Sequence, residues 1–322
     1  MALGKLSSFD KLDVTYATVN SQPLQATVLT PKGLRDKSPG KYPVLVHWHG
    51  GGFVVGHRLY EPWWPQWQVT PALAPALSSD METDSPDYRL LPEAIGSDIL
   101  EDVRDFWLWV SHELPALSAS WHARPDLDSL ACCGESAGGW LSVQSALLFP
   151  GASRIRAIIS SSAPLHAAIP QFTIPQPRTI MGSRPPPPRQ AERVIRSYLR
   201  AMEPGAVKVG CDPSDMWEMV MCIMQQAWLL RLMSAKTDER LDVMGSLAKA
   251  DKVPPMWIIH GLQDSFAPSV CSTEFAKRVQ TVRPDIPLWL TLQPGDHMFD
   301  AYVSMEEGWV RDGCNFLSQY WP

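Results

Sequence analysis

The residues with the clearest chemical potential lie in one short stretch, Gly134-Glu135-Ser136-Ala137-Gly138. An apolar run at 129–133 precedes it, and a helical pattern at 140–149 follows it. Between a strand and a helix, the Gly-x-Ser-x-Gly pattern predicts a nucleophile elbow, a strained turn that exposes a serine hydroxyl. Ser136 is therefore the candidate nucleophile. By itself the pattern is also compatible with an ordinary tight turn between a strand and a helix.

The neighbours of Ser136 suit the same chemistry. Gly134 and Gly138 have no Cβ atom, so strand and helix can approach each other closely. The backbone amide of Ala137 lies at the start of the following helix, where it can bind a developing oxyanion.

A second glycine-rich stretch follows the buried strand pattern at 43–49. The amides of Gly51 and Gly52 in this loop are predicted to complete an oxyanion hole. Phosphate binding is disfavoured, because neither Gly-Lys-Ser/Thr nor Gly-x-Gly-x-x-Gly opens a helix here. A flexible turn remains the alternative. We expect His49 to brace the loop through hydrogen bonds, since it comes too early in the chain to be the base.

Two further residues could complete a nucleophile–base–acid set. Asp264 ends the buried strand pattern at 255–264, and carboxylates at the C-terminal ends of parallel strands lie where α/β enzymes keep their chemistry. The alternative is that Asp264 caps the helix that starts near Ser269. His297 lies on a loop after the last strand pattern, 287–292, and stands third in the order serine, acid, histidine.

The elements that must position these residues follow from the remaining patterns. Alternating β-branched residues at 12–19 and 24–30 predict an antiparallel pair. Strands at 43–49, 129–133, 155–162, 255–264 and 287–292, with helices between them, predict a mostly parallel sheet. Residues 164–252 interrupt this rhythm. We therefore expect a core formed by 1–163 and 253–322, and a helical cap formed by the insertion 164–252, with helices at 190–201 and 214–233.

Composition excludes several classes of protein. The 322 residues include 45% hydrophobic and 19% charged residues, enough to bury a substantial core. The net charge of -6 and the lack of a basic run argue against a nucleic-acid partner. No apolar run approaches the roughly 20 residues needed to span a bilayer. Six scattered cysteines and the absence of a signal-like N-terminus predict a cytoplasmic protein without metal or cofactor.

Three motifs together resemble a known family. His-Gly-Gly-Gly-Phe at 49–53, Asp-Tyr-Arg-Leu-Leu-Pro-Glu at 87–93 and Gly-Glu-Ser-Ala-Gly-Gly at 134–139 occur in the order typical of the hormone-sensitive-lipase-like esterases, a branch of the α/β-hydrolase family. The resemblance runs from about Val44 to the C-terminus. It implies an α/β-hydrolase fold with a helical cap, and a triad of Ser136, Asp264 and His297. Within the 87–93 motif we expect Arg89 and Glu93 to form a buried ion pair.

One segment departs from the family pattern. Members usually have an apolar strand before Asp-Tyr-Arg, but here residues 78–85 read Ser-Ser-Asp-Met-Glu-Thr-Asp-Ser. Such polar side chains are costly in a sheet that is covered on both faces. We expect this strand to be distorted, shortened or exposed.

The principal hypothesis is a carboxylesterase-type serine hydrolase that cleaves a small, hydrophobic or natural-product ester or lactone without a cofactor. The alternative is a lyase, dehydratase or cyclase that uses the same pocket for proton transfer. A non-catalytic hormone receptor of this fold ranks last, because such receptors typically lack a triad member. The substrate is the only small-molecule partner that the sequence implies. The sequence is also compatible with a homodimer.

Overall fold

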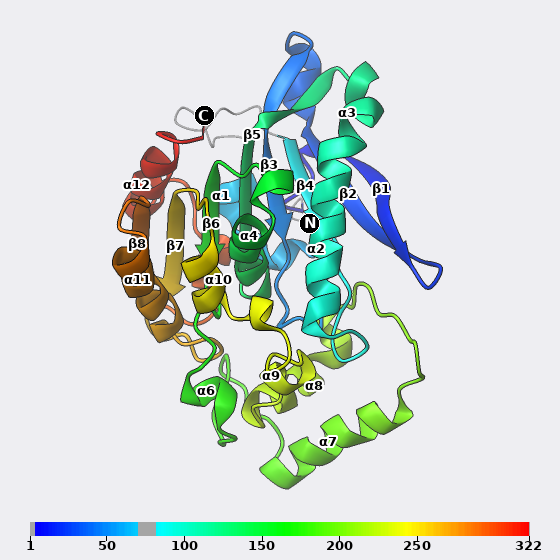
Figure 1. Ribbon diagram of the computed structural model, residues 1–322, viewed down its shortest axis with the longest axis vertical. Helices are drawn as coiled ribbons and strands as arrows, with labels where there is room; N and C mark the ends of the chain where they lie inside the picture. Colours follow the sequence, from blue (N-terminus) through cyan, green and yellow to red (C-terminus); the bar gives the residue numbers. More distant parts are fainter. Residues whose placement is uncertain (1–3, 70–81, 322) are drawn as a thin grey trace.

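One sheet of eight strands organises the part of the chain that the computed structural model describes, residues 4–69 and 82–321 (Figure 1). Its strands lie in the order β1-β2-β4-β3-β5-β6-β7-β8. They are β1 (Phe9–Val19), β2 (Gln22–Pro31), β3 (Gly40–Trp48), β4 (Glu82–Pro86), β5 (Ala123–Glu135), β6 (Ala157–Ser161), β7 (Met256–Gly261) and β8 (Leu288–Gln293). The β1–β2 and β2–β4 pairs are antiparallel, and all pairs from β4 to β8 are parallel. The predicted mostly parallel sheet is confirmed.

Helices cover both faces of this sheet. The helices are α1 (Gln66–Val69), α2 (Gly96–His112), α3 (Leu114–Leu117), α4 (Ala137–Leu148), α5 (Pro150–Ser153), α6 (Pro170–Thr173), α7 (Pro188–Ala201), α8 (Pro213–Gln225), α9 (Leu229–Leu232), α10 (Val243–Lys249), α11 (Val270–Val282) and α12 (Gly308–Leu317). Short 3₁₀ turns join several of them.

The alternation of side chains along the central strands builds two apolar layers. Cys132 on β5 packs in the larger layer with residues of α2, α4 and α11, whereas Cys133 packs in the other layer with residues of α1 and α12. Successive residues of a strand point to opposite faces, so a continuous apolar run is needed where both faces are buried. Both thiols are fully buried, as expected for small core residues.

The polar segment forms a strand despite its composition. Its described part, β4, is only five residues long but pairs with β2 and β3, and residues 83–85 are buried. The expectation of an exposed strand is wrong for residues 83–85. The expectation of a shortened strand stays a prediction, because residues 78–81 lie outside the described residues. The Ser85 hydroxyl donates to the carbonyl of Arg58 at 2.7 Å. The Asp84 carboxyl has an unpartnered buried oxygen, and burial raises its pKa to about 7.

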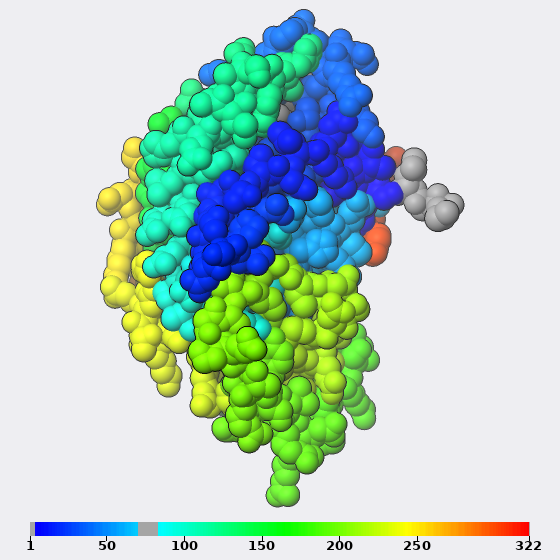
Figure 2. All heavy atoms as spheres, turned by 90° about the vertical axis from the view of Figure 1, so that its right-hand side faces the viewer, coloured from blue at the N-terminus to red at the C-terminus, as the bar shows by residue number. Residues whose placement is uncertain are grey.

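The inserted segment lies at one end of the sheet, where α6, α7, α8 and α9 gather below the strands in Figure 1. Asn20, at the tip of the β1–β2 hairpin, donates to the carbonyl of Gly205, and Figure 2 shows the hairpin (dark blue) directly above this part of the insertion (light green). In contrast, α10 packs against α4 and α11. The insertion is therefore tied to the core at several points.

Two local expectations are wrong. The single helix expected at 214–233 is two helices, α8 and α9, because Ala227 between them has a positive φ of 53°. Arg89 does not pair with Glu93. Instead, Arg89 binds Asp102 on α2 at 2.8 Å, while Glu93 pairs with Lys208 of the insertion at 3.1 Å. The prediction paired two residues that are close in sequence. In the fold, the insertion places Lys208 next to Glu93, and Asp102 on α2 takes Arg89.

Across residues 4–69 and 82–321, no helix is both long enough and apolar enough to cross a membrane.

We expect the substitution Asp84→Asn to change how stability depends on pH. Unfolding restores the pKa of Asp84 from about 7 to its ordinary 3.8. The native state therefore loses stability relative to the unfolded state as pH rises from about 4 to 7, by up to about 4 kcal/mol. Urea denaturation at several pH values measures this loss. The difference in unfolding free energy between wild type and Asp84→Asn should change over this range, whereas parallel pH profiles would contradict a neutral buried carboxyl.

Candidate active site

The turn at Ser136 has the strained geometry expected of a nucleophile elbow. Ser136 has φ 55° and ψ -118°, immediately before the first residue of α4, Ala137. Close packing forces this turn. A Cβ atom on Gly138 would lie 1.8 Å from the carbonyl oxygen of Trp48, and one on Gly134 would lie 2.4 Å from the backbone of Gly138. Both glycines are therefore needed where β3, β5 and α4 converge.

The three residues predicted as a triad come together from distant parts of the chain. The Nε2 atom of His297 lies 2.9 Å from the Oγ of Ser136, and its Nδ1 atom lies 2.7 Å from the Oδ2 of Asp264. All three are buried. With Nδ1 donating to the carboxylate, the unprotonated Nε2 can accept a hydrogen bond from the serine hydroxyl.

Asp264 is held as an anion. Its Oδ1 accepts the backbone N–H groups of Phe266 at 2.9 Å and Ala267 at 2.7 Å. Burial alone would raise the pKa of Asp264, but the charge of His297 and the hydrogen bonds of His260 and His297 outweigh it and hold this pKa well below its ordinary value. Asp264 therefore orients the imidazole. The helix-cap alternative is not needed, because α11 begins only at Val270.

The glycine-rich loop lies against the first turn of α4. Gly51 and Gly52 have positive φ angles of 106° and 62°. A Cβ atom on Gly51 would lie 1.9 Å from the carbonyl oxygen of Val55, so only glycine fits there. His49 Nδ1 donates to the carbonyl of Gly50 at 2.8 Å, and burial lowers the pKa of His49 to about 4. The predicted hydrogen bond between His49 and the loop is present, and the lowered pKa keeps His49 neutral near pH 7.

Glu135 is a site residue that the sequence analysis missed. Its Oε1 accepts the N–H of Gly50 at 2.8 Å, and its Oε2 lies 2.8 Å from Nε2 of His47. Glu135 comes immediately before Ser136, so one carboxylate fixes the loop relative to the elbow. The only signal in the sequence was a carboxylate inside a buried motif, which requires a partner.

Apolar side chains cover the site. Phe266 stacks on the His297 ring with centroids 4.7 Å apart, and Trp217 of α8 stacks on Phe266 at 6.3 Å. A Cβ atom on Gly52 would contact Phe266 at 3.4 Å and Val220 of α8 at 3.7 Å. Helix α8 of the insertion therefore lies directly over the glycine loop.

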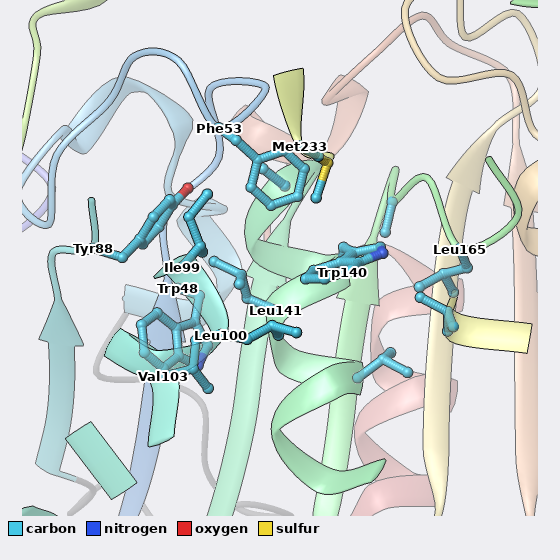
Figure 3. Packing of buried hydrophobic residues seen from close by; sticks show 14 of the residues in the cluster. Trp48, Phe53, Tyr88, Ile99, Leu100, Val103, Trp140, Leu141, Leu165 and Met233 are labelled. Carbon is cyan, nitrogen blue, oxygen red and sulfur yellow. The ribbon is translucent and has the colours of Figure 1, made fainter. Parts of the chain in front are cut away.

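A cavity of about 780 Å³ lies beside α4. Its lining is mostly apolar and includes Trp140, Leu165, Phe172, Leu230, Leu241 and Val243, with Arg231 and Lys236 among its polar residues. The triad residues are not part of this lining. Trp140 connects the two regions: it lies one helical turn after Ser136, its ring meets Phe53 edge-on at 5.4 Å, and Figure 3 shows it between Phe53 and Leu165.

In the described ranges, no group of three or more His, Cys, Asp or Glu side chains is arranged to hold a metal ion.

Comparison with known proteins agrees with this geometry. A family model described as the alpha/beta hydrolase fold matches residues 45–283. The chain belongs to this family. A protein from Phoma sp., named a probable carboxylesterase, is 47% identical over 319 residues, which cover 98% of each chain. A second, from Cochliobolus lunatus and with the same description, is 50% identical over 189 residues, 58% of this chain and 86% of that one.

Solved structures share the fold. A structure from work on two fungal esterases of Rhizomucor miehei superposes with a TM-score of 0.56 at 17% identity, and the match covers 97% of this chain and 82% of that one. At this identity the likeness concerns the fold. The resemblance to the hormone-sensitive-lipase-like branch and the prediction of a carboxylesterase-type hydrolase are confirmed at the level of the family.

We expect Glu135→Ala to lower turnover of p-nitrophenyl butyrate about 10- to 100-fold with little change in KM. The loss would follow because the Gly50 N–H loses its acceptor and the glycine loop shifts. Removing one oxyanion donor outright typically costs about 10²- to 10³-fold, so displacing the loop should cost less. Glu135→Gln is the matched control, since its amide oxygen can still accept from Gly50 and His47 can change tautomer. Equal activity of wild type and both variants would contradict the bracing role.

Proposed function

We propose that the protein is a carboxylesterase that hydrolyses a small, hydrophobic ester or lactone through an acyl-enzyme. Ser136 is the nucleophile, His297 the general base and then the general acid, and Asp264 the residue that orients His297. The single observation that carries the proposal is the continuous hydrogen-bonded chain from Asp264 through His297 to Ser136.

The mechanism follows from the roles of these groups. His297 Nε2 takes the proton of Ser136 as Oγ attacks the ester carbonyl, and the negative charge moves to the carbonyl oxygen. The amides of Gly51, Gly52 and Ala137 stabilise this oxyanion. His297 then gives the proton to the departing alcohol. Water, activated by the same imidazole, attacks the acyl-enzyme, and the second tetrahedral intermediate releases the acid and restores Ser136.

The surroundings of the triad support an apolar substrate of limited size. Helix α8 and Phe266 enclose the site, and the neighbouring cavity is lined mainly by apolar side chains. A confined apolar pocket of this kind suits short acyl groups and the apolar framework of a natural-product ester better than a long lipid chain. The insertion 164–252 is thus proposed to act as a cap on the core formed by 1–163 and 253–322. The homodimer and the cytoplasmic location stay predictions.

Nothing in the geometry favours the alternative lyase, dehydratase or cyclase over hydrolysis. Such an enzyme would leave simple esters untouched while it converted its own substrate.

The test of the proposed chemistry is active-site labelling. A fluorophosphonate probe should label the wild type and the Ser197→Ala control, in which an exposed serine on α7 is removed. Ser136→Ala should abolish both labelling and ester turnover. Asp264→Asn should lower kcat by about 10⁴-fold, because it favours the wrong tautomer of His297. Labelling that persists in Ser136→Ala would place the nucleophile elsewhere.

The cavity beside α4 leads to a second prediction about chain length. Wild type should hydrolyse p-nitrophenyl esters from acetate to hexanoate, with a steep fall by palmitate. Ala167→Phe, which fills part of the cavity, should lower kcat/KM for hexanoate about tenfold, the binding contribution of about two methylene groups. Acetate turnover should change less than about twofold. An equal fall for both esters would show that the cavity does not bind the acyl chain.

A further inference from the structure

A half-buried arginine lies near the triad without an ionic partner. The Nε atom of Arg178 is buried and has no hydrogen-bond partner, and its Nη2 makes only a long hydrogen bond, 3.4 Å, to the carbonyl of Met224. Within the described part of the chain, no carboxylate forms an ion pair with this guanidinium. Buried charges in proteins are almost always paired, because removing them from water is costly.

The backbone around Arg178 is fixed against the active site on two sides. The N–H of Gln176 donates to the carbonyl of Gln225 at the end of α8 at 3.0 Å. The N–H of Met181 donates to the hydroxyl of Ser265 at 2.8 Å, and Ser265 follows the triad residue Asp264. Arg178 therefore lies between the C-terminal end of α8 and the loop that carries the triad acid.

A second donor without a partner lies at the same end of α8. Gln226 is buried, and its side-chain Nε2 atom has no hydrogen-bond partner. Its backbone N–H and the Arg178 guanidinium both approach the carbonyl of Met224. Arg178 and Gln226 thus meet at the C-terminal end of α8, and each has a buried side-chain nitrogen without a partner. Each leaves a desolvated N–H that a ligand oxygen would satisfy.

This end of α8 adjoins the apolar cavity and lies one helical turn beyond the contact of α8 with the glycine loop. Val220, one helical turn before Met224, approaches the glycine loop at Gly52. Ala227, the residue after Gln226, lines the cavity beside α4. A ligand that places an anionic group at Arg178 can therefore place its apolar part in the cavity. The charge of Asp264 also reaches this position, where it opposes the lowering of the Arg178 pKa by burial.

We propose that Arg178, with Gln226, binds a carboxylate on the substrate, so that the preferred substrate is an ester that also carries a free carboxylic acid. The planar guanidinium fork matches the two oxygens of a carboxylate. This inference rests on the proposed esterase function and adds a determinant of specificity to it. The carboxylate belongs either to the acyl part, as in a half-ester of a dicarboxylic acid, or to the alcohol part.

Matched pairs of esters test the proposal and separate the two sources. The acyl-side pair is mono-p-nitrophenyl adipate and its neutral primary amide; adipate avoids the rapid self-cleavage of shorter half-esters. The alcohol-side pair is 4-acetoxybenzoate and 4-acetoxybenzamide. In wild type, kcat/KM should be higher for the anionic member of at least one pair. A neutral member that is preferred in both pairs would overturn the proposal.

The variant Arg178→Met removes the charge and keeps much of the apolar length. It should lower kcat/KM for the preferred anionic ester about 10- to 100-fold, the usual effect of losing a hydrogen bond between charged groups. Turnover of the neutral partner should change less than about threefold. The control Arg193→Met makes the same charge change on the exposed face of α7 and should leave both esters unchanged. If Arg178 only caps α8, both esters of the pair will lose activity equally, and the proposal fails.

A binding measurement separates this proposal from the esterase function. Binding is measured by calorimetry in the inactive variant Ser136→Ala, so the result does not depend on catalysis. This variant should bind adipate and 4-acetoxybenzoate. Adding Arg178→Met should weaken binding of the tighter ligand about tenfold or more. Equal binding of both ligands with and without Arg178 would overturn the carboxylate site even if simple esters are hydrolysed. If the wild type hydrolyses no ester but ligand binding still depends on Arg178, only the esterase proposal is overturned.

Discussion

The candidate site depends on one close backbone contact, between the end of β3 and the first turn of α4. At Gly138 this contact leaves no room for a Cβ atom, because the carbonyl oxygen of Trp48 would lie 1.8 Å from it. The contact brings the glycine loop after β3 against the helix that begins at Ser136. Glu135 then fixes the loop by accepting the Gly50 N–H. A serine in a strained turn and the buried glycine loop are thus held together by sterics and one carboxylate.

The buried polar side chains near this contact differ in how their hydrogen-bonding groups are satisfied. Glu135 has two partners, the Gly50 amide and His47, so its carboxylate is satisfied. Ser85 on β4 donates to backbone carbonyls. The neighbouring residue Asp84 has an unpartnered carboxyl oxygen. Burial raises the pKa of Asp84 to about 7, so the carboxyl takes up a proton where it has no ionic partner, and this lowers the free-energy cost of burying it. The sheet therefore accommodates a polar strand by hydrogen bonding and by neutralisation, at the expense of stability as the pH rises.

The insertion both covers the triad and supplies unsatisfied donors near it. Helix α8 approaches the glycine loop through Val220, and its C-terminal end adjoins Arg178 and Gln226. The core is tied to this cover through Glu93 and Lys208. In the function that we propose, the strand ends of the core carry the chemistry and the covering helices select the substrate.

The sequence by itself determined the sheet, the elbow and the identity of the Ser136, Asp264 and His297 set, because local patterns of apolar residues and glycines define strand ends and tight turns. It could not determine the partners of Arg89 and Glu93, the break at Ala227 or the bracing role of Glu135. The ion pairs and the bracing contact depend on residues far apart in the chain, such as Glu93 with Lys208. The break depends on the positive φ of Ala227. Nor could the polar composition of β4 reveal that Asp84 is buried, since pairing with β2 and β3 outweighs local propensity. Local patterns specify which elements form, but only packing decides which polar groups meet and which remain unpaired.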